Sequence, residues 1–222
     1  MNKPPFAEYL PVWEQLSEDQ RRLLAENTTL RRVEAGTVIH SGSADCLGLL
    51  LIVSGQLRAY LLSDEGREVT LYRLFEWDTC LFSASCMMRN IQFDIFISAE
   101  KDTEFYLVSP KVYADLSRES AALANYMGEI MASRFSEVMW LVEQIMWKNF
   151  DSRLAAFLLE EGRLERSDVL PITHEKIAAH LGTAREVVTR MLRYFQSEGL
   201  VKLRRGAVEL LDQEGLQQYS ER

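Results

Sequence analysis

The segment that most constrains the fold of this chain runs from residue 173 to residue 196. Ile177, Ala178 and Leu181 recur at the spacing of one helical face. Gly182 follows them, where a sharp turn needs a left-handed backbone that glycine adopts at little cost. A second apolar-periodic stretch begins directly after this turn. Small Ala178 would let the two helices approach closely. The segment therefore predicts a helix-turn-helix.

The second helix of this motif divides into an apolar side and a polar side. Thr183, followed three residues later by Glu186, predicts a capping box at its start. Val188 and Met191 should fill the angle between the helices. At about 100° per residue, the polar residues fall within an arc of about 140°. These residues are Arg185, Glu186, Thr189, Arg190 and Arg193. One side is therefore core, and the other is free and rich in arginine.

The charge of the chain is distributed unevenly. The 222 residues include 25 basic and 33 acidic ones, a formal net charge of −8, which excludes a general polycation that coats nucleic acid. Residues 182–206 nevertheless hold six basic and two acidic residues, a net of +4. A concentrated positive patch on an acidic protein is typical of a regulator that binds specific DNA, because phosphate contacts supply affinity.

Residues 200–211 alternate between apolar and polar and predict a hairpin that turns at Arg205-Gly206. Lys202, Arg204 and Arg205 would lie on this wing, near the phosphates that flank the helix-turn-helix. An ordinary solvated hairpin is the alternative. Because the hairpin directly follows the helix-turn-helix, contact between its basic residues and DNA is the favoured interpretation.

The first half of the chain reads as β-structure. Apolar and β-branched runs lie at residues 37–39, 49–53, 57–61, 69–72, 93–97 and 103–108, with glycines between them. Gly66 follows Asp64-Glu65 as at a hairpin tip. Short strands with regular turns predict a closed antiparallel roll. A short helix from Glu18 to Glu26 should pack on its outside.

A long helix should follow the roll, over residues 110–149, where Gly128 is the only glycine and no proline follows Pro110. Arg134 interrupts its apolar stripe. The stripe consists of Leu123, Met127, Ile130, Val138, Leu141 and Ile145. Such a length predicts a coiled-coil seam with a second copy of the chain. The alternative is a long helix that packs only on its own subunit.

The order of roll, long helix and winged helix-turn-helix resembles the Crp/Fnr family of bacterial transcription regulators. The resemblance rests on residues 172–178, 181–182, 185–190 and 198–201, and in the first half on residues 34–39, 52–58 and 64–68. It implies an α+β fold with an N-terminal β-roll of the cyclic-nucleotide-binding type (a jelly roll), a dimerisation helix and a winged helix-turn-helix. The expected domains are residues 1–110 for effector sensing, 111–149 for dimerisation and 150–222 for DNA binding.

The resemblance also implies roles for individual residues in a homodimer that binds an inverted-repeat operator. Arg185, Glu186 and Arg190 match base-reading positions, with Thr189 between them, and Thr173 and Arg193 match positions that contact phosphates. A half-site resembling TGTGA is expected, and RNA polymerase is a further expected partner. Arginine forks suit guanine, and a carboxylate accepts from cytosine. For Glu186, base reading and helix capping both remain open.

Family members that bind cyclic AMP carry a Gly-Glu pair and an Arg-Ser or Arg-Thr pair in the roll, and this sequence departs from both. Leu81 and Phe82 stand at the first pair, and Phe93 and Asp94 at the second. An aromatic ring and a carboxylate disfavour a bound anion. We therefore expect that the effector is not cyclic AMP, and its identity stays unknown.

Residues 77–86 offer an apolar, thiol-containing lining for an uncharged or aromatic ligand. The candidate effector pocket comprises Cys80, Phe82, Ser83, Cys86, Phe93 and Asp94. A thiol switch at Cys80 and Cys86 is an alternative mode of sensing. In a third reading both cysteines are simply buried small hydrophobes.

The remaining features argue against other classes of protein. Three cysteines are too few and unpaired for a disulfide scaffold, the first residues lack a signal-peptide run, and the apolar stretch 47–53 is too short to span a bilayer. We expect a cytoplasmic protein without a membrane partner. Only His40 lies in the roll, so we expect no metal site and no enzyme of the cupin type. A cupin-like small-molecule-binding protein without DNA function and a winged helix used only for protein contacts are the rival readings.

Overall fold

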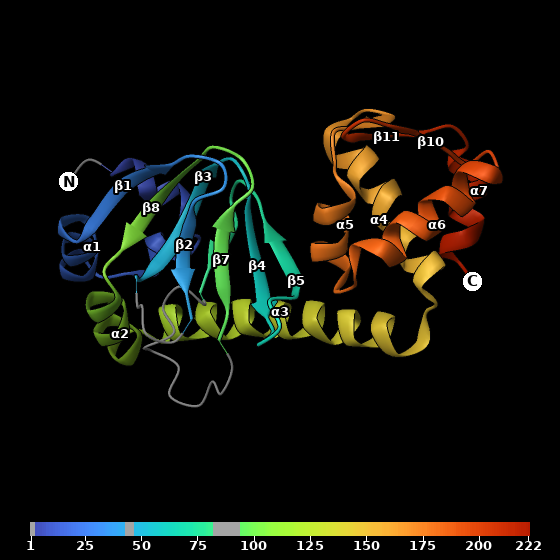
Figure 1. The fold of residues 1–222 in the computed structure, drawn as a ribbon. Coiled ribbons are helices and arrows are strands. Elements are labelled where there is room, and N and C mark those ends of the chain that lie inside the picture. Colours follow the sequence, from blue (N-terminus) through green and yellow to red (C-terminus); the bar gives the residue numbers. More distant parts are fainter. Residues whose placement is uncertain (1–2, 43–46, 82–93) are drawn as a thin grey trace. The chain divides into compact units, whose positions relative to one another are not determined.

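The computed structural model describes residues 3–42, 47–81 and 94–222 (Figure 1). Its internal contacts divide the chain into two compact units. The first comprises Met1–Leu61 and Leu71–Val138, and the second comprises Leu62–Thr70 and Met139–Arg222. No helix of the described residues is long and apolar enough to cross a membrane.

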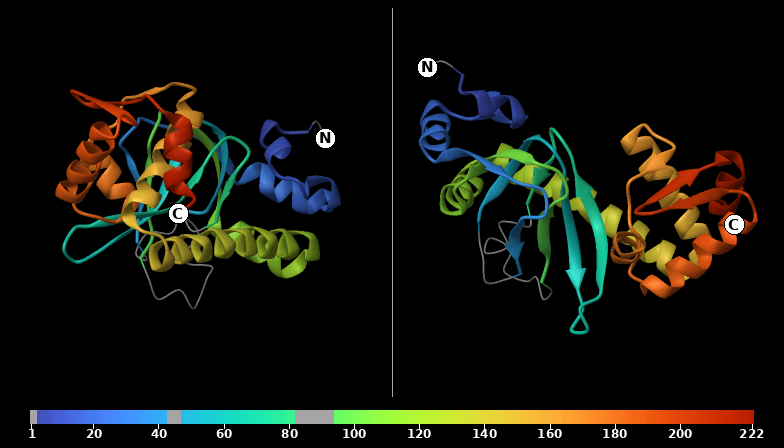
Figure 2. Two further views of the ribbon diagram at one scale, coloured as in Figure 1. Left: turned by 90° about the vertical axis from the view of Figure 1, so that its right-hand side faces the viewer. Right: turned by 45° about the horizontal axis from the view of Figure 1, so that its top comes forward.

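The N-terminal half of the chain is built around two antiparallel sheets of four strands each, which Figure 2 shows from two further directions. These sheets belong to the first unit except for the tip of the β4–β5 hairpin, Leu62–Thr70. One sheet has the order β1-β8-β3-β6, with β1 at Thr28–Val33, β8 at Thr103–Val108, β3 at Leu49–Ser54 and β6 at Thr79–Cys80. The other has the order β2-β7-β4-β5, with β2 at Val38–Ser41, β7 at Phe96–Ala99, β4 at Leu57–Leu62 and β5 at Glu68–Leu74. Gly66 lies in the turn between β4 and β5 at a φ of 78°, as the sequence predicts for a hairpin tip.

Strand β3 explains the longest apolar run of the sequence, because both of its faces are buried. Leu50 and Ile52 point into the core between the two sheets. Leu49 and Leu51, on the opposite face, pack against the N-terminal and central helices. A strand that is covered on both faces reads as a continuous apolar run instead of an alternating one.

Helices cover the outer face of the β3 sheet. They are η1 (Pro5–Tyr9), η2 (Trp13–Gln15), α1 (Glu18–Glu26), α2 (Pro110–Glu119) and the start of α3 (Ala121–Trp147). The bounds of α1 are those expected from the sequence, and a capping box between Ser17 and Gln20 fixes its start. The expected single helix over residues 110–149 is instead two helices, because the chain is extended at Ser120, the C-cap of α2.

The second unit contains the expected winged helix-turn-helix. Its elements are α4 (Phe150–Glu165), β9 (Val169–Leu170), α5 (His174–Leu181), α6 (Arg185–Ser197), β10 (Val201–Arg204), β11 (Ala207–Leu210) and α7 (Gln213–Ser220). The wing hairpin turns at Gly206, as predicted, and gains β9 as a third strand in the order β10-β11-β9. Roll, long helix and winged helix-turn-helix together confirm the expected α+β fold. The limits of the three expected domains stay a prediction.

Candidate nucleic-acid interface

The core of the helix-turn-helix fixes the angle between α5 and α6. Gly182, the C-cap of α5, has a φ of 67°, and its N–H donates to the carbonyl of Ala178. Val188, Leu192 and Phe195 of α6 are fully buried. They share one cluster with α4 and with the wing, so α6 is packed along its whole apolar side. A rigid helix can present its opposite side with a defined geometry.

The capping box that the sequence predicts between Thr183 and Glu186 does not form. The N-cap of α6 is Ala184, without a side-chain cap. The physical reason lies in the turn, where the N–H of Thr183 donates to the carbonyl of Ala178 and so completes the end of α5 instead of starting α6. Of the two roles left open for Glu186, capping is therefore absent.

The free side of α6 carries the predicted polar residues. Arg185, Glu186, Arg190 and Arg193 are exposed, and Thr189 is half-buried among them. Arg185 lies 4.0 Å from a carboxylate oxygen of Glu175. Arg190 and Arg193 form no ion pair with any residue that the structure describes. These guanidinium groups are available to an external anion.

The first turn of α5 lies beside this face. The hydroxyl of Thr173 caps α5 by accepting from the N–H of Lys176 at 3.2 Å, a role that the sequence analysis did not assign to it. Next to it, Nδ1 of His174 shares a hydrogen bond of 2.9 Å with the hydroxyl of Thr189. Burial lowers the pKa of His174, and Arg185 and Arg193 lower it further. Its imidazole is therefore neutral at pH 7.

The wing presents its basic residues on one face. Lys202, Arg204 and Arg205 are exposed, as predicted. Arg204 donates from Nε and Nη2 to one carboxylate oxygen of Glu209, at 2.8 and 2.6 Å. Glu209 stands directly across the hairpin from Lys202, so a carboxylate lies among the wing's positive charges. The sequence analysis missed this acid, although the register of a hairpin that turns at Gly206 indicates it.

Two further features connect the wing to the helix-turn-helix. The side-chain oxygen of Gln196 accepts from the backbone N–H of Leu203 at 2.8 Å, which ties the end of α6 to β10. A cavity of about 370 Å³ lies between the wing turn and the first turn of α5. His174, Arg185 and Arg204 are among its lining residues. Glu175 also lines this cavity, so the concave part of the interface carries one carboxylate beside its two arginines.

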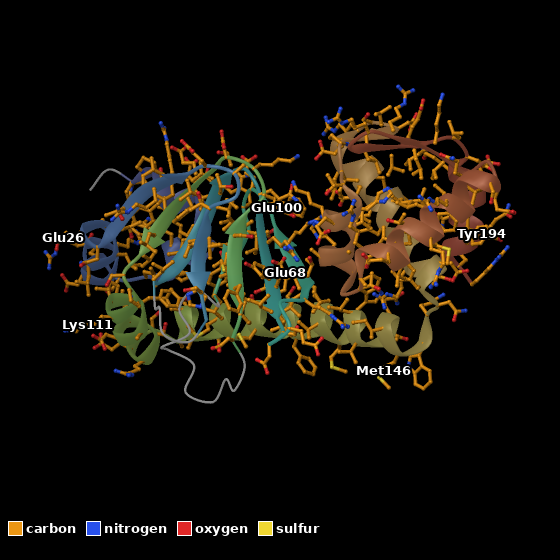
Figure 3. All side chains as sticks on the ribbon, in the orientation of Figure 1. Glu26, Glu68, Glu100, Lys111, Met146 and Tyr194 are labelled. Carbon is orange, nitrogen blue, oxygen red and sulfur yellow. The ribbon has the colours of Figure 1, made fainter. Side chains whose placement is uncertain are left out.

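Helix α3 carries two apolar rows with different surroundings. Four of the six residues that the sequence assigned to a seam with a second copy pack on the two clusters of the first unit, namely Leu123, Met127, Ile130 and Val138. Of the other two, Leu141 is half-buried and Ile145 is 46% exposed. A different set, the outer row, is exposed. It consists of Phe135, Met139, Val142 and Met146, at 38–66% exposure. Figure 3 shows Met146 projecting from the outer side of α3.

Arg134, which interrupts the predicted stripe, is buried against the roll. Its Nη1 donates to both carboxylate oxygens of Glu137 at 2.7 Å, and its Nη2 lies 3.5 Å from Asp78. Its guanidinium lies over the ring of Tyr72, 4.8 Å from the centroid. Burial lowers the pKa of Arg134, but the carboxylates of Glu137 and Asp78 outweigh burial and leave the pKa raised. The arginine joins α3 to the roll as a paired charge.

The candidate effector pocket is described only in part. Cys80 is 1% exposed and lies in β6, where it pairs with Leu50 of β3. Asp94 is exposed. Phe82, Ser83, Cys86 and Phe93 lie outside the described residues. The pocket therefore stays a prediction.

Known proteins resemble both the C-terminal part and the whole chain. Residues 152–219 match the model of the Crp-like helix-turn-helix domain. A crystal structure from Eubacterium rectale, described as a transcriptional regulator of the Crp/Fnr family, is 55% identical. The match covers 97% of this chain and 100% of that one, with a TM-score of 0.95.

More distant relatives show the same similarity. The cyclic AMP receptor protein of Thermus thermophilus is 28% identical over 73% of this chain and 74% of its own length. Another Crp/Fnr-family regulator from the same organism has a TM-score of 0.71 at 21% identity, over 87% of this chain and 99% of that one, which shows a shared fold.

Proposed function

The chain belongs to the Crp/Fnr family of transcription regulators, and we propose that it works as a homodimer that binds an inverted-repeat operator under the control of an effector other than cyclic AMP. Its relatives are DNA-binding regulators and not enzymes, in agreement with the sequence analysis. In this proposal residues 1–110 sense the effector, 111–149 dimerise and 150–222 bind DNA in the cytoplasm. RNA polymerase is a further proposed partner.

The observation that carries the proposal is the free side of α6. Three exposed arginines share this side with a carboxylate and a hydroxyl, on a helix whose other side is packed. Arg190 and Arg193 form no ion pair among the described residues, and Arg185 has only a 4.0 Å pair with Glu175. A helix of this kind enters the major groove with its N-terminal turns against the bases. The proposed base-reading residues are Arg185, Glu186, Thr189 and Arg190, and the proposed phosphate-binding residues are Thr173, Arg193, Lys202, Arg204 and Arg205.

The carboxylate of Glu186 does not cap α6, which supports the proposed base-reading role of this residue. Its carboxylate follows Arg185 in the first turn of α6, is exposed, and caps no backbone N–H of the helix. It is thus available to accept from the amino group of cytosine. Arg185 and Arg190 on either side of it would then each select guanine, which agrees with a half-site resembling TGTGA.

The outer row of α3 supports dimerisation. Phe135, Met139, Val142 and Met146 recur at intervals of four, three and four residues, the spacing of a coiled-coil seam. The exposed Gly128 and Ala132 continue this line toward the start of α3. A second copy of α3 would cover the row and carry an identical row of its own, as a two-fold symmetric interface requires.

For sensing, a neutral or aromatic ligand in the roll is the favoured proposal over a thiol switch. Reactive cysteines need exposure and a positive neighbourhood, whereas Cys80 is 1% exposed. The sequence at Phe82 and Phe93 offers neither the carboxylate nor the arginine that would hold cyclic AMP. Titration calorimetry with cyclic AMP should show no binding, and an affinity in the micromolar range would contradict this part of the proposal.

Selection from a random pool of duplex DNA tests the proposal as a whole. The intact protein should enrich an inverted repeat, and its affinity for that repeat should fall steeply with salt, because counterions leave the contacted phosphates. Enrichment of no motif, together with a salt slope near zero, would contradict DNA reading and favour a winged helix used for protein contacts.

A further inference from the structure

The bond between His174 and Thr189 joins the two helices of the motif at the centre of its DNA-facing side. Thr189 lies one turn from Arg185 and one turn from Arg193 on α6. His174 is the first residue of α5, and its Nδ1 lies 2.9 Å from the Thr189 hydroxyl oxygen. The arginines on this face of α6 are exposed, whereas Thr189 has its polar atom engaged within the protein.

The surroundings of the His174 imidazole favour a single hydrogen bond to the Thr189 hydroxyl. His174 is half-buried, lines the cavity beside the wing turn, and follows Thr173, the N-cap of α5. Burial, together with the positive charge of Arg185 and Arg193, lowers the pKa of His174 and keeps the ring neutral. A neutral imidazole carries one donor and one acceptor nitrogen, so Nδ1 can share a single, directional hydrogen bond with a hydroxyl.

The bond selects one orientation of the threonine side chain. Threonine in a helix divides between two rotamers, because its hydroxyl can also bond to a carbonyl of the preceding turn. Anchoring the hydroxyl to α5 removes that choice. The γ-methyl group is then the part of the half-buried Thr189 side chain that makes no hydrogen bond.

We propose that His174 is a positioning residue for sequence reading, which holds the Thr189 hydroxyl so that the Thr189 methyl group meets the bases. Apolar contact with a threonine methyl suits the C5-methyl group of thymine. The half-site should therefore contain a thymine that is selected for its methyl group, beside the guanines read by Arg185 and Arg190. This inference rests on the proposed DNA binding.

Replacing single thymines by deoxyuridine in the selected operator tests the inference, because uracil pairs like thymine and lacks only the methyl group. At one base pair of the half-site, the substitution should weaken binding about fourfold. This factor corresponds to the free energy of burying one methyl-sized group. Thr189→Val keeps the methyl group in the one rotamer that valine strongly prefers in a helix, so it should retain this loss without the bond to His174. Thr189→Ser keeps the hydroxyl alone and should abolish it.

Variants of His174 separate positioning from a merely structural role. His174→Ala should reduce the fourfold thymine-to-uracil effect toward unity. His174→Asn places an amide near the position of Nδ1 and should restore the effect. Lys176→Ala, which removes an exposed charge from the same helix, serves as the control and should leave the effect unchanged. The guanine preferences should persist in all of these variants.

The outcomes distinguish the inference from the function on which it rests. If the protein selects no motif, DNA reading itself fails. If it selects a motif in which no thymine-to-uracil change weakens binding, or if His174→Ala retains the full effect with an unchanged melting temperature, DNA reading stands and the role of His174 is overturned.

Discussion

Arg190 and Arg193 are both exposed arginines of α6, yet their positions predict different roles. Arg190 lies near the centre of the reading face, and Arg193 lies one turn closer to the C-terminal end of the helix. Arg190→Ala should weaken binding to the selected operator by about 1–3 kcal/mol and relax the preference at one guanine. Arg193→Ala should weaken binding to all sequences alike and reduce the salt slope by about one unit.

Repeating the selection and the salt titration with both variants checks this prediction. Lys111→Ala, on α2 of the first unit, provides a matched loss of one exposed positive charge outside the DNA-binding unit of the proposal. A motif that survives Arg190→Ala but changes with Arg193→Ala would show that the two roles are reversed.

Arg134 is a second residue whose environment predicts a measurable effect. Its side chain is 10% exposed and pairs with Glu137 and Asp78. Arg134→Ala should lower the free energy of unfolding by about 2 kcal/mol, the typical value for hydrogen bonds to charged groups. Arg118→Ala removes an exposed i,i+3 pair with Asp115 and should cost less than about 0.5 kcal/mol. Urea denaturation of both variants measures the difference, and equal losses would contradict the prediction.

At the scale of elements, helix α3 shows what periodicity can and cannot predict. Its length and its apolar character follow from the sequence. Periodicity does not decide which row forms the proposed seam, because adjacent residues such as Val138 and Met139 lie only about 100° apart and both rows repeat at threes and fours. Most of the row that the sequence favours packs on the roll instead. Arg134 within the chosen row was the signal that this row faces the roll, where Asp78 and Glu137 receive its charge.

The two rows of α3 should respond differently to charge. Met139→Asp combined with Val142→Asp should produce a folded monomer, because carboxylates from both copies would face each other in the seam. Ile130→Asp combined with Val138→Asp is the matched pair on the roll side, and it should destabilise the first unit instead. Light scattering and melting curves distinguish the two outcomes. A dimeric Met139/Val142 variant would place the interface elsewhere.

The proposed DNA-facing surface was more predictable than the proposed seam. The face of α6 follows from helical spacing alone, and the wing from alternation. The capping of α5 by Thr173 is a local bond to Lys176, and a threonine just before a helix is a signal that could have predicted it. The bond between His174 and Thr189 depends on how two helices pack, which spacing within one helix does not encode. Most residues of the candidate effector pocket lie outside the described residues, so its geometry stays a prediction.

At the scale of the whole molecule, the proposed dimer predicts a fixed operator geometry. Two α6 helices related by a two-fold axis should meet half-sites about 34 Å apart, one turn of DNA. Inserting about five base pairs between the half-sites turns the second onto the opposite side of the duplex. Affinity should then fall about a hundredfold, to that of a single half-site, because the gain from two-site binding is lost. Insertion of about ten base pairs provides the control for rotation, and an affinity that is indifferent to the five-pair insertion would contradict the dimer.

The exposed outer row of α3 makes the stability of the protein in the cell depend on its concentration. A lone chain presents Phe135, Met139, Val142 and Met146 to water, and such apolar surface invites adventitious association and attack by proteases. If the proposed dimer forms, a rising concentration of the protein covers the row and stabilises the folded state at the same time. At a low concentration of the protein, regulation would therefore fail for two reasons. Few operators would be occupied, and monomers would be degraded before they could dimerise.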